Sequence, residues 1–396
     1  MSDGARRPAE ATPDPPAAPL RVLQVGAGAM GRSWLRLLAE SPEVELVGLV
    51  DLDQQAARSA AEATGHRGVA VAGSLGELLP VVDAEAVLDI TVPAAHAAVS
   101  REALRHGLPV LGEKPLAESV SAGLGMVAAA ERSGQLLAVS QSRRHWRQLT
   151  AFRGQISRLG DLGLVSCQFF RAPRFGGFRD AMAFPLLVDM AIHQFDLARD
   201  LMSSEPVEAF CVSSNPPWSW YAGDAAATAV FRFADGARFT FDGSWCSPGQ
   251  ETSWNGRWRL ATAAGSVVWD GDHAPTAERA DGSDVPGTGS EAPEQITGSL
   301  AEFVRVLRDG GVPSGEVSRN VLSVAMVDAA IASAGSGRWV RIADLLETAH
   351  GQALAQERVP AVREVLAGWP SVSARVGLPA AGAPDLVRGG SGDVLE

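Results

Sequence analysis

A glycine-rich turn near the N-terminus constrains the fold of this chain more than any other feature of its sequence. Gly26, Gly28 and Gly31 have the spacing G-x-G-x-x-G. An apolar run ends at Val25 and an amphipathic stretch begins at Met30. Glycines at these positions permit a tight turn, a close approach of the backbone to a pyrophosphate, and close packing of helix on strand. The pattern predicts a strand, a turn and a helix whose N-terminus receives phosphate groups.

An acidic residue at the end of the next predicted strand indicates the kind of nucleotide. Asp51 follows Gly31 by 20 residues. From there a carboxylate accepts hydrogen bonds from the adenosine ribose hydroxyls and repels a 2′-phosphate. We therefore expect NAD as the cofactor, with NADP disfavoured, and we expect Ala29 and Met30 to line its site. The alternative is a tight strand–helix turn without a ligand, which the acid at this position makes less favoured.

The order of the predicted elements divides the chain into two domains. Strands and helices alternate over 20–142, which is typical of an α/β domain with a doubly wound parallel sheet, the Rossmann arrangement. Six strand-like runs within 143–346, several joined by Asp-Gly or Ala-Gly turns, predict an α+β domain with a large, mostly antiparallel open sheet. Residues 271–294 are rich in Gly, Pro, Asp and Ser, and we predict a loop there.

The two ends of the chain differ from these domains. Residues 1–19 are rich in proline, alanine and acids, and we predict a disordered leader. Residues 347–396 are predicted as a C-terminal extension with a disordered tail.

Composition excludes several kinds of partner. The formal net charge is −12, so we expect no nucleic-acid-binding surface, which needs clustered cations. Cys167, Cys211 and Cys246 lack metal-type or redox-type spacing, and we predict no metal site. No uninterrupted apolar run approaches the roughly 18 residues of a membrane helix, and acids and prolines follow Arg6-Arg7 where an export signal requires an apolar segment. We expect a cytoplasmic protein without a membrane partner.

The one lysine of the chain lies at a predicted ligand-binding edge. The 34 basic residues include a single lysine, Lys114, within the run Glu113-Lys114-Pro115. This run follows an apolar strand, at the edge where open parallel sheets bind ligands. An ammonium group is compact and its pKa can be tuned, whereas a guanidinium is planar and stays charged. The alternative, a surface ion pair in a turn, is disfavoured by this position and by the scarcity of lysine.

A predicted helix over 184–202 carries a polar stripe. Asp189, His193, Asp196 and Asp200 recur at offsets of 4, 3 and 4, with apolar residues on both sides. We expect Asp189 to orient His193, a residue type suited to proton exchange near neutral pH. The alternative is the solvated face of an amphipathic helix, and the sequence chemistry alone does not decide between the two.

Aromatic residues gather in the second predicted domain. Five of the ten tryptophans fall within 41 residues, together with the only tyrosine, Tyr221. Aromatic faces stack on the apolar faces of sugar rings. Packing in the sheet or at a subunit interface accounts for most of them, and we expect one or two to line a pocket. The predicted substrate contacts are Arg171, Trp220 and Tyr221, together with Asp189 and His193 of the polar stripe.

Together these motifs resemble the glucose–fructose oxidoreductase / inositol dehydrogenase (Gfo/Idh/MocA) family over about residues 20–346. The resemblance rests on the glycine turn, on Thr91-Val92-Pro93 with His96, on Glu113-Lys114-Pro115, and on the Asp189, His193 and Asp196 spacing. It implies that Lys114, His193 and Asp189 form the catalytic set. It also implies that the cofactor contacts Thr91, Pro93, His96, Glu113, Lys114 and Pro115.

The expected reaction is NAD-dependent oxidation of a secondary alcohol on a sugar, sugar derivative or cyclitol, or the reverse reduction. One alternative is an NAD-dependent glycosidase that oxidises its sugar transiently, for which Tyr221 is the only tyrosine available as a base. Another is a non-catalytic NAD-binding regulator, against which the presence of both Lys114 and His193 counts. We expect a homodimer or homotetramer, because a large open sheet with exposed tryptophans is suited to self-association.

Overall fold

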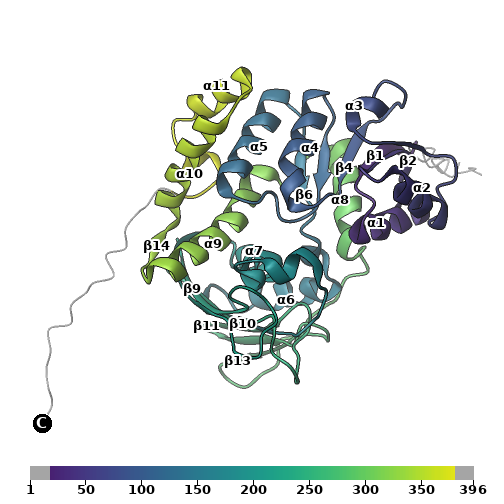
Figure 1. Cartoon of the computed structure of the whole chain (residues 1–396). Coiled ribbons are helices and arrows are strands. Elements are labelled where there is room, and N and C mark those ends of the chain that lie inside the picture. The colour runs from purple at the N-terminus through teal and green to yellow at the C-terminus, as the bar shows by residue number, and fades with distance from the viewer. Residues whose placement is uncertain (1–17, 380–396) are drawn as a thin grey trace, which may run out of the picture.

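A computed structural model describes residues 18–379 of the chain (Figure 1). Of the leader predicted as disordered over 1–19, residues 1–17 lie outside the described residues, as does the whole of the tail predicted as disordered from residue 381. A six-stranded sheet and an eight-stranded sheet organise the described part.

The first sheet is parallel throughout, with the strand order β3-β2-β1-β4-β5-β6. The order reverses between β1 and β4, and the crevice beyond the carboxyl ends of these strands is where such sheets bind ligands. The predicted doubly wound sheet is therefore confirmed. Its strands are β1 (Leu20–Val25), β2 (Val44–Val50), β3 (Ala70–Ala72), β4 (Ala86–Asp89), β5 (Val110–Gly112) and β6 (Leu137–Val139).

Helices cover both faces of this sheet, because alternate residues of its central strands point to opposite sides. Leu23 and Val87 belong to the cluster that includes α4 and α5, whereas Val22 and Leu88 pack with α1 on the other face. One helix connects each strand to the next along the chain: α1 (Ala29–Glu40), α2 (Gln54–Ala63), α3 (Leu75–Leu78), α4 (Pro93–Arg105) and α5 (Val120–Ser133).

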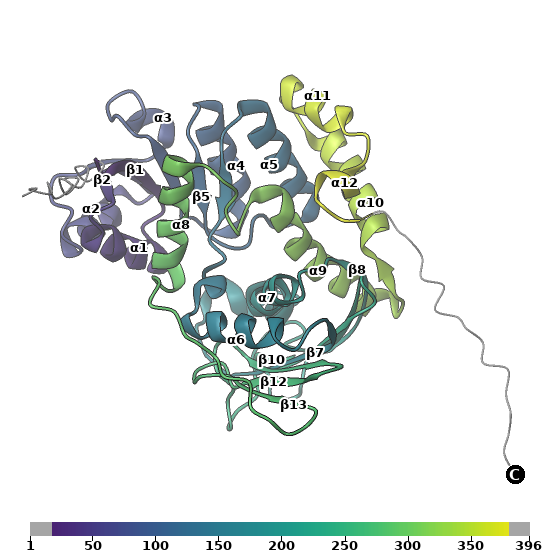
Figure 2. The ribbon, with the colours of Figure 1, turned by 180° about the vertical axis from the view of Figure 1, so that it is seen from behind.

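Helix α8 (Gln295–Asp309) lies across the same face as α1, although it comes late in the chain (Figure 2). Three of its side chains, each at most 2% exposed, join Trp34 and Leu88 in one buried cluster: Leu300, Phe303 and Val304. A segment far beyond residue 142 therefore completes the core of the first sheet.

The second sheet is mixed, with the strand order β13-β12-β11-β7-β10-β9-β8-β14. Strands β7 and β10 pair in parallel, and the other neighbours pair antiparallel. The predicted large, mostly antiparallel sheet is confirmed. Its strands are β7 (Leu162–Phe170), β8 (Pro206–Ser214), β9 (Ala226–Phe233), β10 (Arg238–Ser244), β11 (Arg257–Thr262), β12 (Gly265–Trp269), β13 (Thr276–Arg279) and β14 (Val340–Arg341).

Helices pack on one face of this second sheet. Phe195 of α7 (Ile192–Met202) lies against Phe231, Phe239 and Phe241, with ring centroids 4.8, 6.2 and 5.3 Å away. Helix α6 (Arg147–Ser157) contributes Phe152 to the same core. Helix α9 (Val317–Ser336) is long and apolar enough to cross a membrane by length and composition, yet 72% of that window is buried inside the protein. It is therefore a core helix.

The structure corrects two details of the predicted elements. Strand β13 lies inside the segment 271–294, which was predicted as a loop, because its residues add to the edge of the sheet beside β12. The predicted helix over 184–202 begins as a π-helix, Leu186–Ala191, and continues as α7.

The chain after residue 341 folds onto the first domain. Helices α10 (Ile342–Gln356) and α11 (Pro360–Gly368) pack against α5, and α12 (Val372–Arg375) packs on α10. Trp369 donates a hydrogen bond to Glu131 of α5 over 3.0 Å. Much of the predicted C-terminal extension is thus part of the folded core.

Candidate active site

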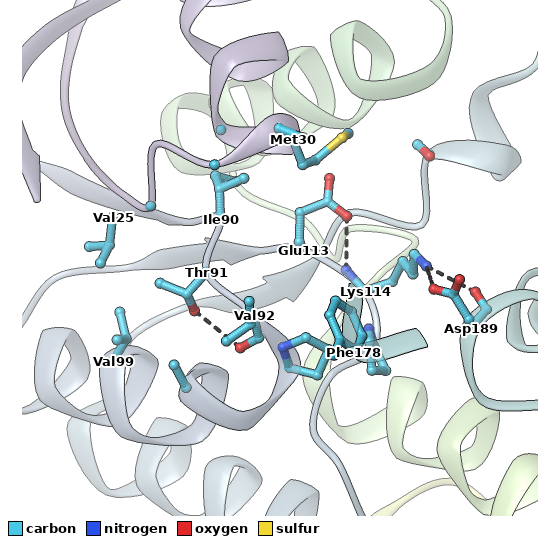
Figure 3. Close-up of a pocket in the computed structure, with 18 of the residues that line it drawn as sticks. Val25, Met30, Ile90, Thr91, Val92, Val99, Glu113, Lys114, Phe178 and Asp189 are labelled. Atoms are coloured by element: carbon cyan, nitrogen blue, oxygen red, sulfur yellow. Dashed lines mark hydrogen bonds and ion pairs between the residues drawn. The ribbon is translucent and has the colours of Figure 1, made fainter. Parts of the chain in front are cut away.

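A cavity of about 990 Å³ lies where the carboxyl edge of the first sheet faces the helices of the second domain. Figure 3 shows part of it, with Glu113 and Lys114 on one side and Asp189 approaching from the other domain. The lining residues extend from the glycine turn to Gln295 at the start of α8, so both domains contribute to one site.

The glycine turn at one end of the cavity depends on the absence of side chains. Gly26 has a φ of +100°, and a Cβ there would lie 2.3 Å from the carbonyl oxygen of Ile90. A Cβ on Gly31 would lie 2.3 Å from the carbonyl oxygen of Gly26. Both distances are far below van der Waals contact, so the tight strand–helix packing excludes any other residue.

Gly28 is different, and it provides the test of whether a dinucleotide fits here. A Cβ on Gly28 would meet nothing within 4 Å, so the backbone at this point is open to the cavity that Gly28 lines. Gly28 is also the N-cap of α1 and gives it no side-chain cap, which leaves backbone N–H groups for an anion. With Ala29 and Met30 also lining the cavity, these residues fit a pyrophosphate.

Asp51 lies beside this turn and also lines the cavity. Its carboxylate accepts hydrogen bonds from the backbone N–H groups of Ala27, over 2.7 Å, and Asp53, over 2.9 Å. These bonds fix the carboxylate at the end of β2, in the wall of the cavity.

The predicted cofactor residues after β4 separate into two groups. Thr91 and Pro93 line the cavity, but His96 does not. The His96 ring is buried, with Nδ1 2.7 Å from the carbonyl oxygen of Pro115 and Nε2 3.2 Å from that of Thr91. His96 therefore ties α4 to the turn that carries Lys114 and takes no direct part in the cavity wall.

Glu113 is buried at the middle of the cavity. It accepts hydrogen bonds from the Trp34 indole N–H, over 2.9 Å, and from the backbone N–H of Lys114, over 3.1 Å. Burial raises its pKa above the usual value, and the indole hydrogen bond opposes that effect. Pro115, which also lines the cavity, follows Lys114 through a cis peptide bond.

Lys114 reaches across to the second domain (Figure 3). Its Nζ donates to the backbone carbonyl of Asp189 over 3.0 Å and lies 3.6 Å from the carboxylate of the same residue. The other carboxylate oxygen of Asp189 accepts from Nε of Arg179 over 2.7 Å. Asp189 is thus shared between two cations, and the ammonium of Lys114 is held in a fixed position.

His193 lines the same end of the cavity and is 7% exposed. Its pKa is held well below the usual value by burial first, and then by the positive charges of Lys114 and Arg143. The imidazole is therefore neutral near pH 7 and able to accept a proton. Its Nδ1 is buried and has no hydrogen-bond partner among the described residues.

Asp189 does not orient His193 as the sequence spacing predicted. Its carboxylate pairs with Arg179 and Lys114. The reason lies in the backbone: Asp189 belongs to the π-helix, whose wider turn changes its direction relative to His193 at the start of α7. An offset of four residues places side chains on one face only where the α-helix is continuous.

The remaining acids of the stripe have a structural role. Asp196, 1% exposed, accepts two hydrogen bonds from Arg144, over 2.7 and 2.8 Å. Burial acts to raise the pKa of Asp196, but Arg144 outweighs it and holds that pKa below the usual value. Asp200 pairs with Arg153. Neither acid lines the cavity.

Of the predicted substrate contacts, Asp189 and His193 line the cavity, whereas Arg171, Trp220 and Tyr221 do not. Arg171 pairs with Glu251 over 2.7 Å and stacks on Trp254. Tyr221 is 4% exposed, and its hydroxyl donates to the carbonyl of Pro173 over 3.4 Å. Burial is the main cause that raises its pKa to about 12. Trp220 packs beside the tyrosine and under Arg174. Arg171 therefore supports the cavity wall through Trp254, and the contacts of Trp220 and Tyr221 are to residues outside the wall.

Other residues line the reacting end of the cavity, which is the end where Lys114 and His193 lie. Trp254, Asn255 and Asp272 line it from loops between strands of the second sheet. Phe178 and Arg179 line it from the 3-10 helix Gly177–Ala181, which precedes the π-helix. Arg143 completes the wall just after β6. The sequence did not assign these residues to the site one by one, although two signals were present. Trp254 belongs to the tryptophan-rich segment, and Arg143, Arg144 and Arg147 cluster just after the last strand of the parallel sheet.

The fold and the cavity define an NAD(P)-binding Rossmann oxidoreductase, and sequence comparison identifies its family. Residues 20–141 match the profile of the "oxidoreductase family, NAD-binding Rossmann fold", and residues 155–268 match the "GFO/IDH/MocA C-terminal domain". The chain belongs to the Gfo/Idh/MocA family of NAD(P)-dependent oxidoreductases.

Three known proteins illustrate the similarity. The chain is 26% identical to D-apiose dehydrogenase of Paraburkholderia graminis over 348 residues, 81% of this chain and 89% of that protein. It is 30% identical to inositol 2-dehydrogenase of Renibacterium salmoninarum over 190 residues, 47% of this chain and 56% of that protein. An oxidoreductase from Agrobacterium radiobacter, solved with NAD+, L-tartaric acid and magnesium, superposes with a TM-score of 0.74 at 19% identity, covering 83% of this chain and 99% of its own. That last likeness shows the fold.

Proposed function

We propose that this protein transfers hydride between NAD and a secondary alcohol of a sugar, sugar derivative or cyclitol. The observation that supports it most is the pairing of a fixed ammonium, Lys114, with a neutral buried imidazole, His193, in one cavity with the glycine turn. The named relatives, an apiose and an inositol dehydrogenase, act on this class of compound.

The protein's own residues handle the proton and the developing charge. As the C–H bond breaks, the substrate O–H bond also breaks, its proton passes to the imidazole of His193, and a C=O double bond forms. Lys114 stabilises the negative charge that develops on that oxygen. The bound nicotinamide supplies the acceptor of the hydride in this direction.

Asp189 positions Lys114 in this scheme. Its carbonyl and carboxylate hold the ammonium on the His193 side of the cavity. The carboxylate thereby places the positive charge of Lys114 where an alkoxide would develop. Arg179 limits how much of the negative charge of Asp189 Lys114 receives, because it pairs with the same carboxylate.

NAD rather than NADP is the proposed cofactor, held by Gly28 and the N-terminus of α1 and by Asp51. We extend the proposal to a homodimer or homotetramer in the cytoplasm. Static light scattering of the purified protein measures the oligomer directly.

The test is a screen for NADH formation, by absorbance, with monosaccharides, sugar acids and inositols. We expect turnover with at least one of them, and we expect Lys114→Met to lower kcat about 1,000-fold while calorimetry shows unchanged NAD binding. Arg147→Gln is the matched control, since its side chain is half-exposed and pairs with Glu294. Wild-type-like turnover in Lys114→Met would remove Lys114 from the mechanism.

The two alternative functions have less support. The glycosidase scheme needs Tyr221 as a base, and that hydroxyl is buried outside the cavity wall with a raised pKa. A glycosidase would release an aglycone without net NADH, so the same absorbance screen separates it from a dehydrogenase. A regulator would bind NAD and show no turnover with any member of the panel.

A further inference from the structure

Arg143 is a cation at the reacting end of the cavity that lacks an acidic partner. Among residues 18–379, no carboxylate oxygen forms an ion pair with its guanidinium. Its only protein hydrogen bond in this part of the chain goes to the side-chain oxygen of Asn255. Burial, and then the charge of Arg171, lower the pKa of Arg143 to about 10. A mostly desolvated cation is costly unless an opposite charge pairs with it.

Arg144, the next residue in the same turn, differs from Arg143 because acidic side chains neutralise its charge. Arg144 makes two hydrogen bonds to the carboxylate of Asp196 and a third, over 2.8 Å, to the carbonyl of Ser314. Asp200 lies 3.6 Å away from it. Arg144 therefore has its charge neutralised within the protein, whereas Arg143, in the cavity wall, does not.

The polar residues around Arg143 have hydrogen-bond or ion-pair partners of their own, so the charge of Arg143 is available to a ligand. Asn255 is 3% exposed and donates its side-chain N–H to the carbonyl of Gly271 over 2.7 Å, so its oxygen is held toward Arg143. The charge of Asp272 acts to raise the pKa of Arg143. Its carboxylate accepts a hydrogen bond from Ser253 over 2.7 Å and, among the described residues, forms no ion pair with Arg143. Arg171, the neighbouring cation, is already paired with Glu251.

We propose that Arg143 binds a carboxylate or phosphate group of the substrate, so that the protein acts on an acidic sugar or cyclitol derivative in preference to a neutral one. This inference rests on the proposed function and names its substrate class. A guanidinium presents parallel N–H donors that match two oxygens of one oxyanion. The charges of Arg143 and Lys114 both act on His193. If Arg143 binds the anionic group of the substrate, Lys114 can still contact the hydroxyl that is oxidised.

The experiment compares substrates that differ only in this charge. Hexuronates and hexonates are assayed with NAD beside their methyl esters and lactones, and sugar 6-phosphates are assayed beside the parent sugars. We expect kcat/KM for the preferred acid to exceed that for its neutral counterpart at least 10-fold. Whether carboxylates or phosphates show the preference identifies the source of the anion.

Three variants test whether Arg143 causes the preference. Arg143→Gln should lower kcat/KM for the acid about 100-fold and that for the neutral counterpart less than 3-fold. Arg143→Lys keeps the charge and loses the planar arrangement of N–H donors. Its kcat/KM for the acid should lie between those of Arg143→Gln and the wild type. Arg147→Gln, four residues further along, should retain the wild-type preference.

A binding measurement separates failure of this inference from failure of the proposed function. Calorimetry of the NADH-loaded protein with the same acids and esters reports recognition without turnover. Preferential binding of an acid that Arg143→Gln abolishes supports the inference, even if no compound in the panel is oxidised. Equal binding of acids and neutral counterparts by the wild type overturns it, as does an equal loss for both in Arg143→Gln.

Discussion

The two ends of the cavity are built in different ways. At the glycine turn the constraint comes from the backbone: Gly26 and Gly31 allow no Cβ, and Gly28 opens the helix N-terminus to the cavity. At the reacting end the constraint comes from charged side chains on both domains, of which Lys114 and Asp189 are in contact. The glycine turn has room for a ligand because side chains are absent there, whereas the reacting end offers charged side chains to a ligand.

This difference predicts how each end responds to mutation. In the glycine turn an added side chain meets either the backbone, as at Gly26, or the space proposed for the cofactor, as at Gly28, so changes there affect stability or cofactor affinity. Side chains at the reacting end contact each other through hydrogen bonds and charge, so changes there affect turnover and leave the cofactor bound. The four predictions below test this separation, from the largest expected effect to the smallest.

The largest effect is expected for His193→Asn. Asparagine cannot accept and release a proton near neutral pH, so kcat should fall about 1,000-fold. NAD affinity, measured by calorimetry, should stay within about 3-fold of the wild type. A parallel loss of NAD binding would show that the two ends are not separable.

Two glycine-to-alanine substitutions in the glycine turn should have different effects, one on the affinity for NAD and the other on the stability of the fold. Gly28→Ala has free space for its Cβ within the protein and a φ of −63°, so we expect normal thermal unfolding. NAD affinity should drop about 30-fold, since the methyl group occupies the space proposed for the pyrophosphate. Gly26→Ala is the matched comparison, and its clash with Ile90 should lower the free energy of unfolding by about 3 kcal/mol. Unaltered NAD affinity in Gly28→Ala would contradict the proposed pyrophosphate site.

Asp51→Asn should change cofactor preference. The amide removes the negative charge that disfavours a 2′-phosphate, so the ratio of NAD to NADP affinity should fall about 10-fold. Asn also has one acceptor oxygen in place of two, and the bonds to Ala27 and Asp53 cannot both be kept in the same form. Thermal unfolding without cofactor controls for that structural cost.

The smallest effect concerns the pKa of His193, which the positive charges of Lys114 and Arg143 help to lower. Lys114→Met removes one of these charges and should raise that pKa toward its usual range. In the wild type the acidic limb of kcat/KM should therefore lie below pH 6.5, because activity requires the neutral ring. NMR titration of the His193 ring in both proteins measures the shift, and a lower pKa in the variant would have the wrong sign.

The sequence predicted the glycine turn because its requirements are local. The glycines, the preceding strand and Asp51 all fall within about one βαβ unit. The same holds for Glu113 and Lys114, since the end of a parallel strand places them at the ligand edge without further information. The class of each sheet also followed from the order of strands and helices.

Other parts depend on contacts between distant segments. Asn255 meets Arg143 across 112 residues of sequence, and no local pattern indicates that pairing. The direction of Asp189 depends on a π-helix, which the hydrophobic spacing of 184–202 does not distinguish from an α-helix. Strand β13 has only four residues in a polar segment and forms because β12 offers a free edge.

The return of α8 to the first sheet has a consequence for how such proteins can be divided. A fragment ending near residue 142 would contain every strand of the dinucleotide-binding sheet and still expose Trp34 and Leu88 to water, since Leu300, Phe303 and Val304 cover them. The cofactor-binding domain is therefore not an independently folding fragment. A ribosome must complete about three quarters of the chain before that domain acquires its whole core, and any recombination that exchanges the substrate domain must carry a compatible returning helix with it.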